Sequence, residues 1–578
     1  MARQVEQYQY LPLPNRTSIR LLRINTRDKF SQLECTLKTV DLDSDSPPFH
    51  ALSYTWGNPH AKARDEHRFT QHYNALDAEY LFPSAGVPVK CDGKRLLVSR
   101  NLYDALRDVP ENAWKTFINR RNDSKGWTRL HTNSINGDAK RVKSLIASGV
   151  DLDTRDHEGM TALVWAVRLQ RREVVKLLAM AGAKVEIADY EKKTALDYAR
   201  EINDCEIISH LTAERKSLAS SLEKPEQDGP EIWLWVDQIC INQADPDERS
   251  FQVDLMHRIY HDAEFTLIWL GREDGYTKRA AELIPRFAKA GNQFIDSAIL
   301  PYAQNSTELH ASEGVPYISE GEWDALAALF QRQYFRRLWI VQEIILSGIV
   351  LAYCGGVEIP WRLFCITAQM LHYHQQKLGT EVSAKYVPLN EGGRGIEQPI
   401  VQLLEWQDRF GPNPPPDKQR VASLENLIFD TWHFHATDPR DKIYGIYGLL
   451  NKKAQSGEGS EVRWRTDYTK PVEQVYAEAT KRIILDAGEL RILSAVLDHS
   501  WRKIESLPSW TPDYSVTWTN MMSSYSNAAG NLPIPTPLIE LSEPWGHLTV
   551  QGLQIDMVLG IGKTTSGPAD LKRFFDPS

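Results

Sequence analysis

Trp339 and Glu343 are a residue pair whose types and spacing could do chemistry. They are four positions apart in a segment that we expect to be helical, so both side chains lie on one helix face. An indole beside a carboxylate could hold a flat aromatic group and stabilise the positive charge that develops when a ribosyl bond breaks. Alternatively, Trp339 belongs to the core and Glu343 pairs with Arg336 or Arg337, since a glutamate on a helix is usually solvated. The residue types alone favour this structural alternative.

Asp237 and Arg249 are a second pair of candidates. Asp237 interrupts the apolar run 232–241, and a buried carboxylate must be paired or functional because its desolvation is costly. At the carboxyl end of a parallel strand it would face the crevice where ligands bind, so we favour a role in lining a site over a catalytic role. Arg249 lies in the first turn of the next predicted helix, where the helix dipole does not favour a cation. Contact with a phosphate group is one role open to it.

The third candidate is the turn that follows the apolar segment 49–54. Its residues are Ser53, Tyr54, Trp56 and Gly57, followed directly by Asn and Pro. A turn at the end of a first strand is a natural place for nucleotide contacts. A purely structural turn is an equally good interpretation.

Short apolar runs and helical patterns alternate around these candidates. Segments 49–54, 232–241 and 265–271 are typical of buried strands, and 245–263 is typical of an amphipathic helix. A longer helical pattern covers 322–347 and carries Trp339 and Glu343. Alternation of strands with helices predicts an α/β protein with a parallel sheet flanked by helices.

A 33-residue repeat separates the first apolar segment from the second. Thr128, Thr161 and Thr194 mark the period, and each is followed two positions later by leucine. A period of this length with T-x-L opening a helix resembles the ankyrin repeat. Helix pairs of this kind cannot bury their apolar faces alone, so they must stack. About two full repeats plus half-units fit in 124–222, so we expect the array to be stabilised by contacts with the domain into which it is inserted.

The composition limits the class of protein. Among 578 residues, 42% are apolar and 25% are charged, which excludes a disordered chain, a collagen and a coiled-coil rod. The net charge of −9 gives no electrostatic reason to expect nucleic acid or an anionic membrane as partner. Six cysteines without a CxxC pair predict a reducing, cytoplasmic location and no zinc site of the usual spacing. No apolar run is long enough for a membrane span.

Five sequence blocks together resemble the motifs of the fungal heterokaryon incompatibility (HET) domain. In chain order they are ALSYTWG (51–57), the run 234–271, FRRLWIVQEI (335–344), DPRDKIYGIYGLL (438–450) and LPSWTPDYS (507–515). The resemblance covers most of residues 15–520 apart from the ankyrin-like insertion. It implies a role in non-self recognition between fungal strains and in a cell-death response.

HET domains in turn resemble Toll/interleukin-receptor (TIR) domains, which implies a TIR-like (flavodoxin-like) sheet. In TIR domains that hydrolyse NAD, the catalytic glutamate lies in a W-x-x-x-E helix, which corresponds here to Trp339 and Glu343. The resemblance therefore implies Glu343 as the catalytic residue and NAD as a substrate, with no cofactor and no metal. The residues implied in substrate binding are Ser53, Tyr54, Trp56, Gly57, Asp237, Arg249 and Trp339. Two departures from the TIR pattern are Ile340, where a cysteine is usual, and the long stretch 272–320.

These observations predict four regions and two alternative functions. The regions are the N-terminal part of the HET domain (15–110), an all-α ankyrin insertion (124–222), the rest of the HET domain (230–350) and a mixed C-terminal region (351–578). The first function is an incompatibility effector or regulator that hydrolyses NAD and is controlled by homo-oligomerisation. The second is a non-enzymatic signalling module in which the HET core and the ankyrin repeats bind a protein partner.

Overall fold

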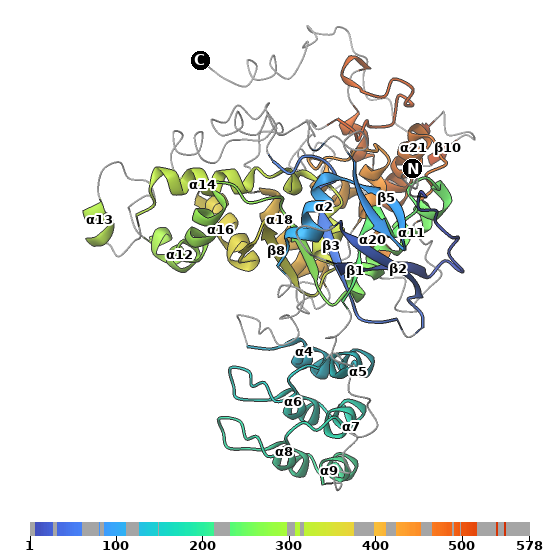
Figure 1. Ribbon diagram of the computed structural model, residues 1–578. Coiled ribbons are helices and arrows are strands. Elements are labelled where there is room, and N and C mark those ends of the chain that lie inside the picture. The colour runs from blue at the N-terminus through green and yellow to red at the C-terminus, as the bar shows by residue number, and fades with distance from the viewer. Residues whose placement is uncertain are drawn as a thin grey trace, which may run out of the picture.

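The computed structural model describes most of the chain (Figure 1). The described residues are 6–26, 32–44, 46–60, 80, 86–110, 126–147, 149–212, 232–296, 307–312, 317–374, 398–411, 423–451, 465–487, 490–496, 499–516, 539–541 and 548–550. Parts of the predicted C-terminal region, such as 375–397 and 517–538, lie outside these ranges.

A nine-stranded mixed sheet organises the described residues. Its spatial order is β5-β4-β2-β1-β6-β3-β7-β8-β9. The strands are β1 (Ser18–Thr26), β2 (Glu34–Asp41), β3 (Phe49–Tyr54), β4 (Val87–Cys91), β5 (Lys94–Val98), β6 (Trp233–Trp235), β7 (Thr266–Trp269), β8 (Val350–Cys354) and β9 (Val357–Ile359). A separate two-stranded sheet pairs β10 (Ile539–Leu541) with β11 (Leu548–Val550).

The centre of the large sheet is parallel, as the sequence predicts, but most of the pairs on its flanks are antiparallel. β6, β3, β7 and β8 run parallel to one another, whereas β1 pairs antiparallel with β2 and β6, and β9 pairs antiparallel with β8. Across the sheet these four strands follow one another as β6, β3, β7 and β8, which are the second, first, third and fourth of the four along the chain. Their residues are buried on both faces, which explains why β6 and β7 are continuous apolar runs rather than alternating ones.

Two predicted elements end earlier than expected. The strand predicted at 232–241 stops at Trp235, and residues Asp237–Cys240 form the short helix α10. Asp237 accepts a hydrogen bond from the backbone N–H of Gln238 at 2.7 Å. This bond satisfies a helix-end donor, and the chain turns away from the sheet at this point. The prediction that Asp237 lies within a strand is therefore wrong, but the residue does lie at the carboxyl end of β6.

The helix predicted over 322–347 is three elements: α14 (Glu320–Phe330), the 3₁₀ turn η4 (Gln333–Arg336) and α15 (Ile340–Ile345). Long-range bonds break it. Arg332 forms an ion pair with Asp274 at 2.6 Å, and the backbone of Gln333 bonds to the carbonyl of Pro59 at 3.0 Å. Because these partners are distant in sequence, helical periodicity could not reveal the break.

The helix α11 (Pro246–Asp262) follows the sequence prediction closely. The Asp245 side chain caps it by accepting from the backbone N–H groups of Asp247 and Glu248, and proline occupies the first position. Glu248 is not simply a dipole-stabilising acid. Its carboxylate forms a buried, two-bond ion pair with Arg20 of β1, at 2.6 and 2.9 Å, which ties α11 to the sheet.

The ankyrin segment forms a separate stack that projects from the core (Figure 1). Its described helices are α4 (Arg129–Asn136), α5 (Ala139–Ala147), α6 (Ala162–Arg168), α7 (Arg172–Met180), α8 (Ala195–Glu201) and α9 (Cys205–Thr212). They make three helix pairs, where the sequence predicts about two full repeats plus half-units. The stack does contact its host. Arg141 pairs with Asp262, the last residue of α11, at 3.2 Å, and Arg129 pairs with Glu264 in the turn between α11 and β7.

The remaining described helices come from the HET-like region and the C-terminal part of the chain. They are α2 (Arg100–Asp108), α12 (Thr277–Asp296), α13 (Thr307–Ser312), α16 (Trp361–His374), α18 (Gln398–Phe410), α19 (Leu424–Thr431), α20 (Asp441–Asn451) and α21 (Val472–Ala487), with 3₁₀ turns η7 (Arg491–Ala495) and η8 (His499–Trp501). One continuous core includes side chains of the sheet and of α20 and α21. None of the described helices has the length and apolar character that crossing a membrane requires.

Candidate functional site

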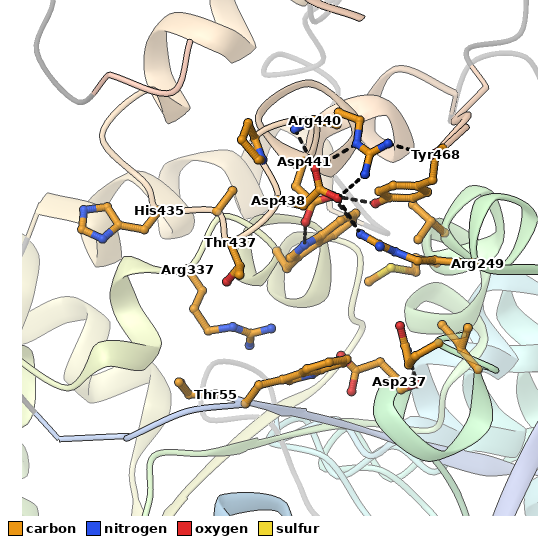
Figure 2. Close-up of a pocket in the computed structure, with 18 of the residues that line it drawn as sticks. Thr55, Asp237, Arg249, Arg337, His435, Thr437, Asp438, Arg440, Asp441 and Tyr468 are labelled. Carbon is orange, nitrogen blue, oxygen red and sulfur yellow. Dashed lines mark hydrogen bonds and ion pairs between the residues drawn. The ribbon is translucent and has the colours of Figure 1, made fainter. Parts of the chain in front are cut away.

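A pocket of about 720 Å³ opens beyond the carboxyl ends of β3 and β6 (Figure 2). Its volume lies within the range of small-molecule sites. Thr55, Trp56 and Gly57 reach it from the end of β3, and Asp237 reaches it from the end of β6. Since β3 is the strand at which the strand order reverses, this is where open α/β sheets bind their ligands.

Glu343 lines this pocket from α15 and is almost fully buried, with 2% of its surface exposed. Its carboxylate accepts a hydrogen bond from the hydroxyl of Ser53, and the hydroxyl of Tyr334 lies 2.6 Å from the same serine oxygen. These contacts fix the carboxylate against the end of β3. Glu343 therefore lines the pocket and also contacts the end of β3, through Ser53.

Arg337 is the cation that interacts with both buried carboxylates of this end of the pocket, Glu343 and Asp237. Its guanidinium is 3.7 Å from Glu343 and donates to the backbone carbonyl of Tyr54. Figure 2 shows it pointing into the pocket from the side opposite Arg249. Asp237 is held separately, because its carboxylate accepts from the Trp56 indole at 2.8 Å. Both interpretations of Glu343 thus hold in part: it reaches a pocket, and it pairs with an arginine.

Burial dominates the electrostatics here. It raises the pKa of Glu343 to about 7, although Arg337 and the Ser53 hydrogen bond act in the opposite direction. Burial also raises the pKa of Asp237, again against the effect of Arg337. A carboxylate that changes charge near neutral pH is suited to acid–base work.

We expect the stability of the wild type relative to Glu343→Gln to fall as the pH rises. The pKa of about 7 in the folded state exceeds the ordinary 4.5, so the stabilisation is complete below pH 4.5 and is lost as the pH rises through 7. The difference in free energy of unfolding should shift by about 3 kcal/mol in favour of the variant between pH 4.5 and 8. Urea unfolding measures it, with the surface substitution Glu478→Gln as baseline. A difference that does not vary with pH would show that burial leaves Glu343 unperturbed.

The opposite wall of the pocket comes from the described residues between 423 and 516, here called the C-terminal layer. No local sequence signal connected this layer with the site. Residues 435–441 and Tyr468 form this wall. The backbone of 336–338 pairs with that of His435. The N–H of Leu338 donates to the carbonyl of His435 at 2.9 Å, and the N–H of His435 donates to the carbonyl of Arg336 at 2.5 Å. The segment that leads into α15 is therefore joined directly to the far wall.

A network of side chains fixes this wall (Figure 2). Asp441 accepts from the Trp339 indole at 3.0 Å and from the Tyr468 hydroxyl at 2.5 Å. The guanidinium of Arg249 stacks on the ring of Tyr468, 3.7 Å from its centroid, and pairs with Asp438 at 3.2 Å. Arg440 also binds Asp438, at 2.7 Å. Indole, phenol and guanidinium groups are therefore held in fixed orientations around the pocket.

The structure brings most of the predicted site residues to one place. Those that line the pocket are Trp56, Gly57, Asp237, Arg249, Trp339 and Glu343. Ser53 and Tyr54 do not line it: Ser53 is behind Glu343, and Tyr54 is buried with its hydroxyl 3.5 Å from Gln238. Sequence reasoning missed several polar lining residues, among them Arg337, Asp438, Asp441 and Tyr468. Two of them, Asp438 and Asp441, belong to the DPRD motif, which was noted as part of the HET resemblance and not as a site signal.

Comparison with known proteins identifies two families along this chain. The family model "Heterokaryon incompatibility protein (HET)" matches residues 189–343, and the model "Ankyrin repeats (3 copies)" matches residues 102–189 and 130–218. Both identifications made from the motifs are confirmed. The HET match includes α11 and ends at Glu343, within α15.

A curated relative is similar over much of the chain. It is the "Heterokaryon incompatibility protein 6, OR allele" of Neurospora crassa, 25% identical over 394 residues. The alignment covers 59% of this chain and 55% of the relative, so the chain spans about half the length of the curated relative it matches.

Proposed function

Proceeding from these matches, we propose that the chain is a cytoplasmic effector or regulator of fungal heterokaryon incompatibility and cell death, with a TIR-like core that hydrolyses NAD. The HET match and the name of the Neurospora relative support the role in incompatibility. The order second, first, third and fourth of the parallel strands is that of flavodoxin-like sheets, which supports the TIR-like core. In this proposal, 15–110 and 230–350 form the HET domain around the ankyrin insertion 124–222, and the region 351–578 adds a wall to its pocket.

One observation carries the enzymatic part of the proposal. The Glu343 carboxylate is buried at a pocket of about 720 Å³ whose lining also includes the indoles of Trp56 and Trp339. Hydrolysis of the nicotinamide–ribose bond needs a carboxylate near the ribose and an aromatic surface for the leaving ring. The lining supplies both within one hollow.

The proposed reaction follows from this arrangement. The bond between the ribose C1′ and the nicotinamide nitrogen breaks, and its electron pair stays on nicotinamide, which leaves as a neutral ring. Ionised Glu343 stabilises the positive charge on the ribose, and water adds to C1′ and transfers its proton to the carboxylate. Arg249 contacts the phosphates, and Ser53 holds the carboxylate in place. We also propose that homo-oligomerisation controls this activity, as is common for TIR-like domains.

A nicotinamide-release assay tests the proposal. Purified full-length chain is incubated with NAD at several protein concentrations, with and without a crowding agent that promotes assembly, and nicotinamide and ADP-ribose are quantified by chromatography. Equal amounts of both products are expected. Absence of release at every concentration would favour the binding function described next.

The alternative function is a protein-binding module. Three ankyrin helix pairs are docked on the core through Arg129 and Arg141, and they expose Leu169, Met180 and Tyr190. Exposed apolar and aromatic side chains on a repeat stack are suited to binding a protein partner. Replacing Tyr190 with serine separates the two functions, because it should weaken partner binding and leave NAD hydrolysis intact.

A further inference from the structure

Asp441 is the residue of the pocket wall with the most informative contacts. It begins α20 and is 5% exposed, yet it lines the pocket. Each of its carboxylate oxygens holds a different ring: one accepts from the Trp339 indole at 3.0 Å, and the other accepts from the Tyr468 hydroxyl at 2.5 Å. Both rings line the same hollow.

The influence of Asp441 extends to a cation. Tyr468 carries the guanidinium of Arg249 on its ring face at 3.7 Å, and Arg249 is itself 3.9 Å from Asp441. If the phenol lost its acceptor, the ring and the stacked guanidinium would gain rotational freedom. One carboxylate therefore orients an aromatic wall directly and a cation indirectly.

Trp339 lies where this network meets the helix of Glu343. It is the cap residue of α15, and it follows the segment 336–338 that pairs with His435. Burial raises the pKa of Asp441 to about 6, so at pH 7.5 it is ionised and accepts both bonds. The C-terminal layer thus contributes acceptors, not only packing, to the pocket.

We propose that Asp441 is a positioning residue that holds Trp339 and Arg249 in the orientation that binds the base and the phosphates of a pyridine dinucleotide. This inference rests on the proposed function for its substrate class. It assigns the affinity of the pocket to the C-terminal layer, more than 90 residues beyond the catalytic candidate, and assigns the bond-breaking step to Glu343.

Kinetics and binding of full-length variants test this role at pH 7.5. Asp441→Ala, which removes both acceptors, should raise KM for NAD by about 10-fold to 100-fold, with kcat changed less than about threefold. Kd for ADP-ribose should rise by a smaller factor of about 3-fold to 10-fold, because ADP-ribose has the phosphates but lacks the nicotinamide ring. Asp441→Asn keeps one acceptor oxygen and should recover part of the loss. Tyr468→Phe removes only the phenol hydroxyl, so it should give a smaller rise in both constants. ADP-ribose binding is measured by calorimetry, independently of turnover.

Asp513→Asn is the matched control. Asp513 is also a buried aspartate of the C-terminal layer, but it accepts from the backbone N–H groups of Lys503 and Ile504 and does not line the pocket. It should lower Tm without changing KM or Kd.

If Asp441→Ala behaved in the same way, or lowered kcat with KM and Kd unchanged, the inference would be wrong. If the wild type bound ADP-ribose with dependence on Asp441 but released no nicotinamide, the proposed hydrolysis would fail and the positioning role would stand. Failure of the wild type to bind ADP-ribose would overturn the inference.

Discussion

Glu343→Gln is expected to lower kcat for nicotinamide release from NAD by about 10³-fold, because the amide keeps the shape of the side chain but cannot carry the negative charge that stabilises the ribosyl cation. The amide oxygen can still accept the hydrogen bond from Ser53, so the pocket should remain intact. KM should change little. Steady-state kinetics at pH 8, where the wild-type carboxylate is ionised, measure the effect.

The matched control for this loss is Glu425→Gln. Glu425 is a buried glutamate that forms a two-bond pair with Arg491, at 2.6 and 3.1 Å, and it does not line the pocket. Its substitution should cost stability but leave kcat near the wild-type value. If Glu343→Gln released nicotinamide as fast as the wild type, the catalytic assignment would be wrong even though the activity existed.

Arg337→Met is expected to lower the free energy of unfolding by about 3–5 kcal/mol at pH 8, because it leaves buried carboxylates without their nearby cation. The positive charge of Arg337 acts on both Glu343 and Asp237, because it opposes the rise in pKa that burial causes in each of them. The loss should shrink towards pH 5, where Glu343, whose pKa is about 7, takes up a proton. Urea unfolding at the two pH values measures both effects.

Two comparisons separate charge loss from simple loss of packing. Arg482→Met removes an arginine from an exposed pair with Asp486 and should cost less than about 1 kcal/mol. In the double variant Arg337→Met with Glu343→Gln, one of the two buried charges is gone, so part of the lost stability should return. Equal losses in the single and double variants would mean that Arg337 acts through packing alone.

Local signals predicted the central elements well. Segment 49–54 matches β3 and the parallel pairing of β3, β6 and β7 was expected, because short apolar runs alternate with a well-capped helix. The antiparallel flank was not predicted. β1 alternates only imperfectly, since both Leu21 and Leu22 are buried, and its partner β2 carries exposed polar residues. The 33-residue period revealed the ankyrin stack, because equivalent residues of successive helix pairs recur at that spacing.

The sequence predicted those residues of the candidate site that lie close together within one motif. The motif with Trp339 and Glu343 indicated one wall, but Trp339 precedes α15 rather than lying inside a continuous helix. Arg337 reaches the pocket because the chain leaves the helical path after α14, and this path is set by contacts with Asp274 and Pro59. Asp441 meets Trp339 across 102 residues of chain. Contacts over such separations depend on the assembled tertiary structure, and no local pattern encodes them.

The ankyrin contact has a geometric relation to the pocket. Arg141 binds Asp262 at the end of α11, and Arg249 reaches the pocket from the first turn of the same helix. A single helix therefore connects the docked repeats with the wall that holds Arg249.

The most direct test of the account follows NAD by proton NMR while purified full-length wild type and Glu343→Gln are incubated with it in parallel at pH 8. The account predicts that the wild type converts the nicotinamide resonances of NAD into those of free nicotinamide, with matching growth of ADP-ribose signals, and that the variant leaves the spectrum unchanged over the same time. An unchanged spectrum with wild type at every protein concentration, or equal conversion by both proteins, would contradict it.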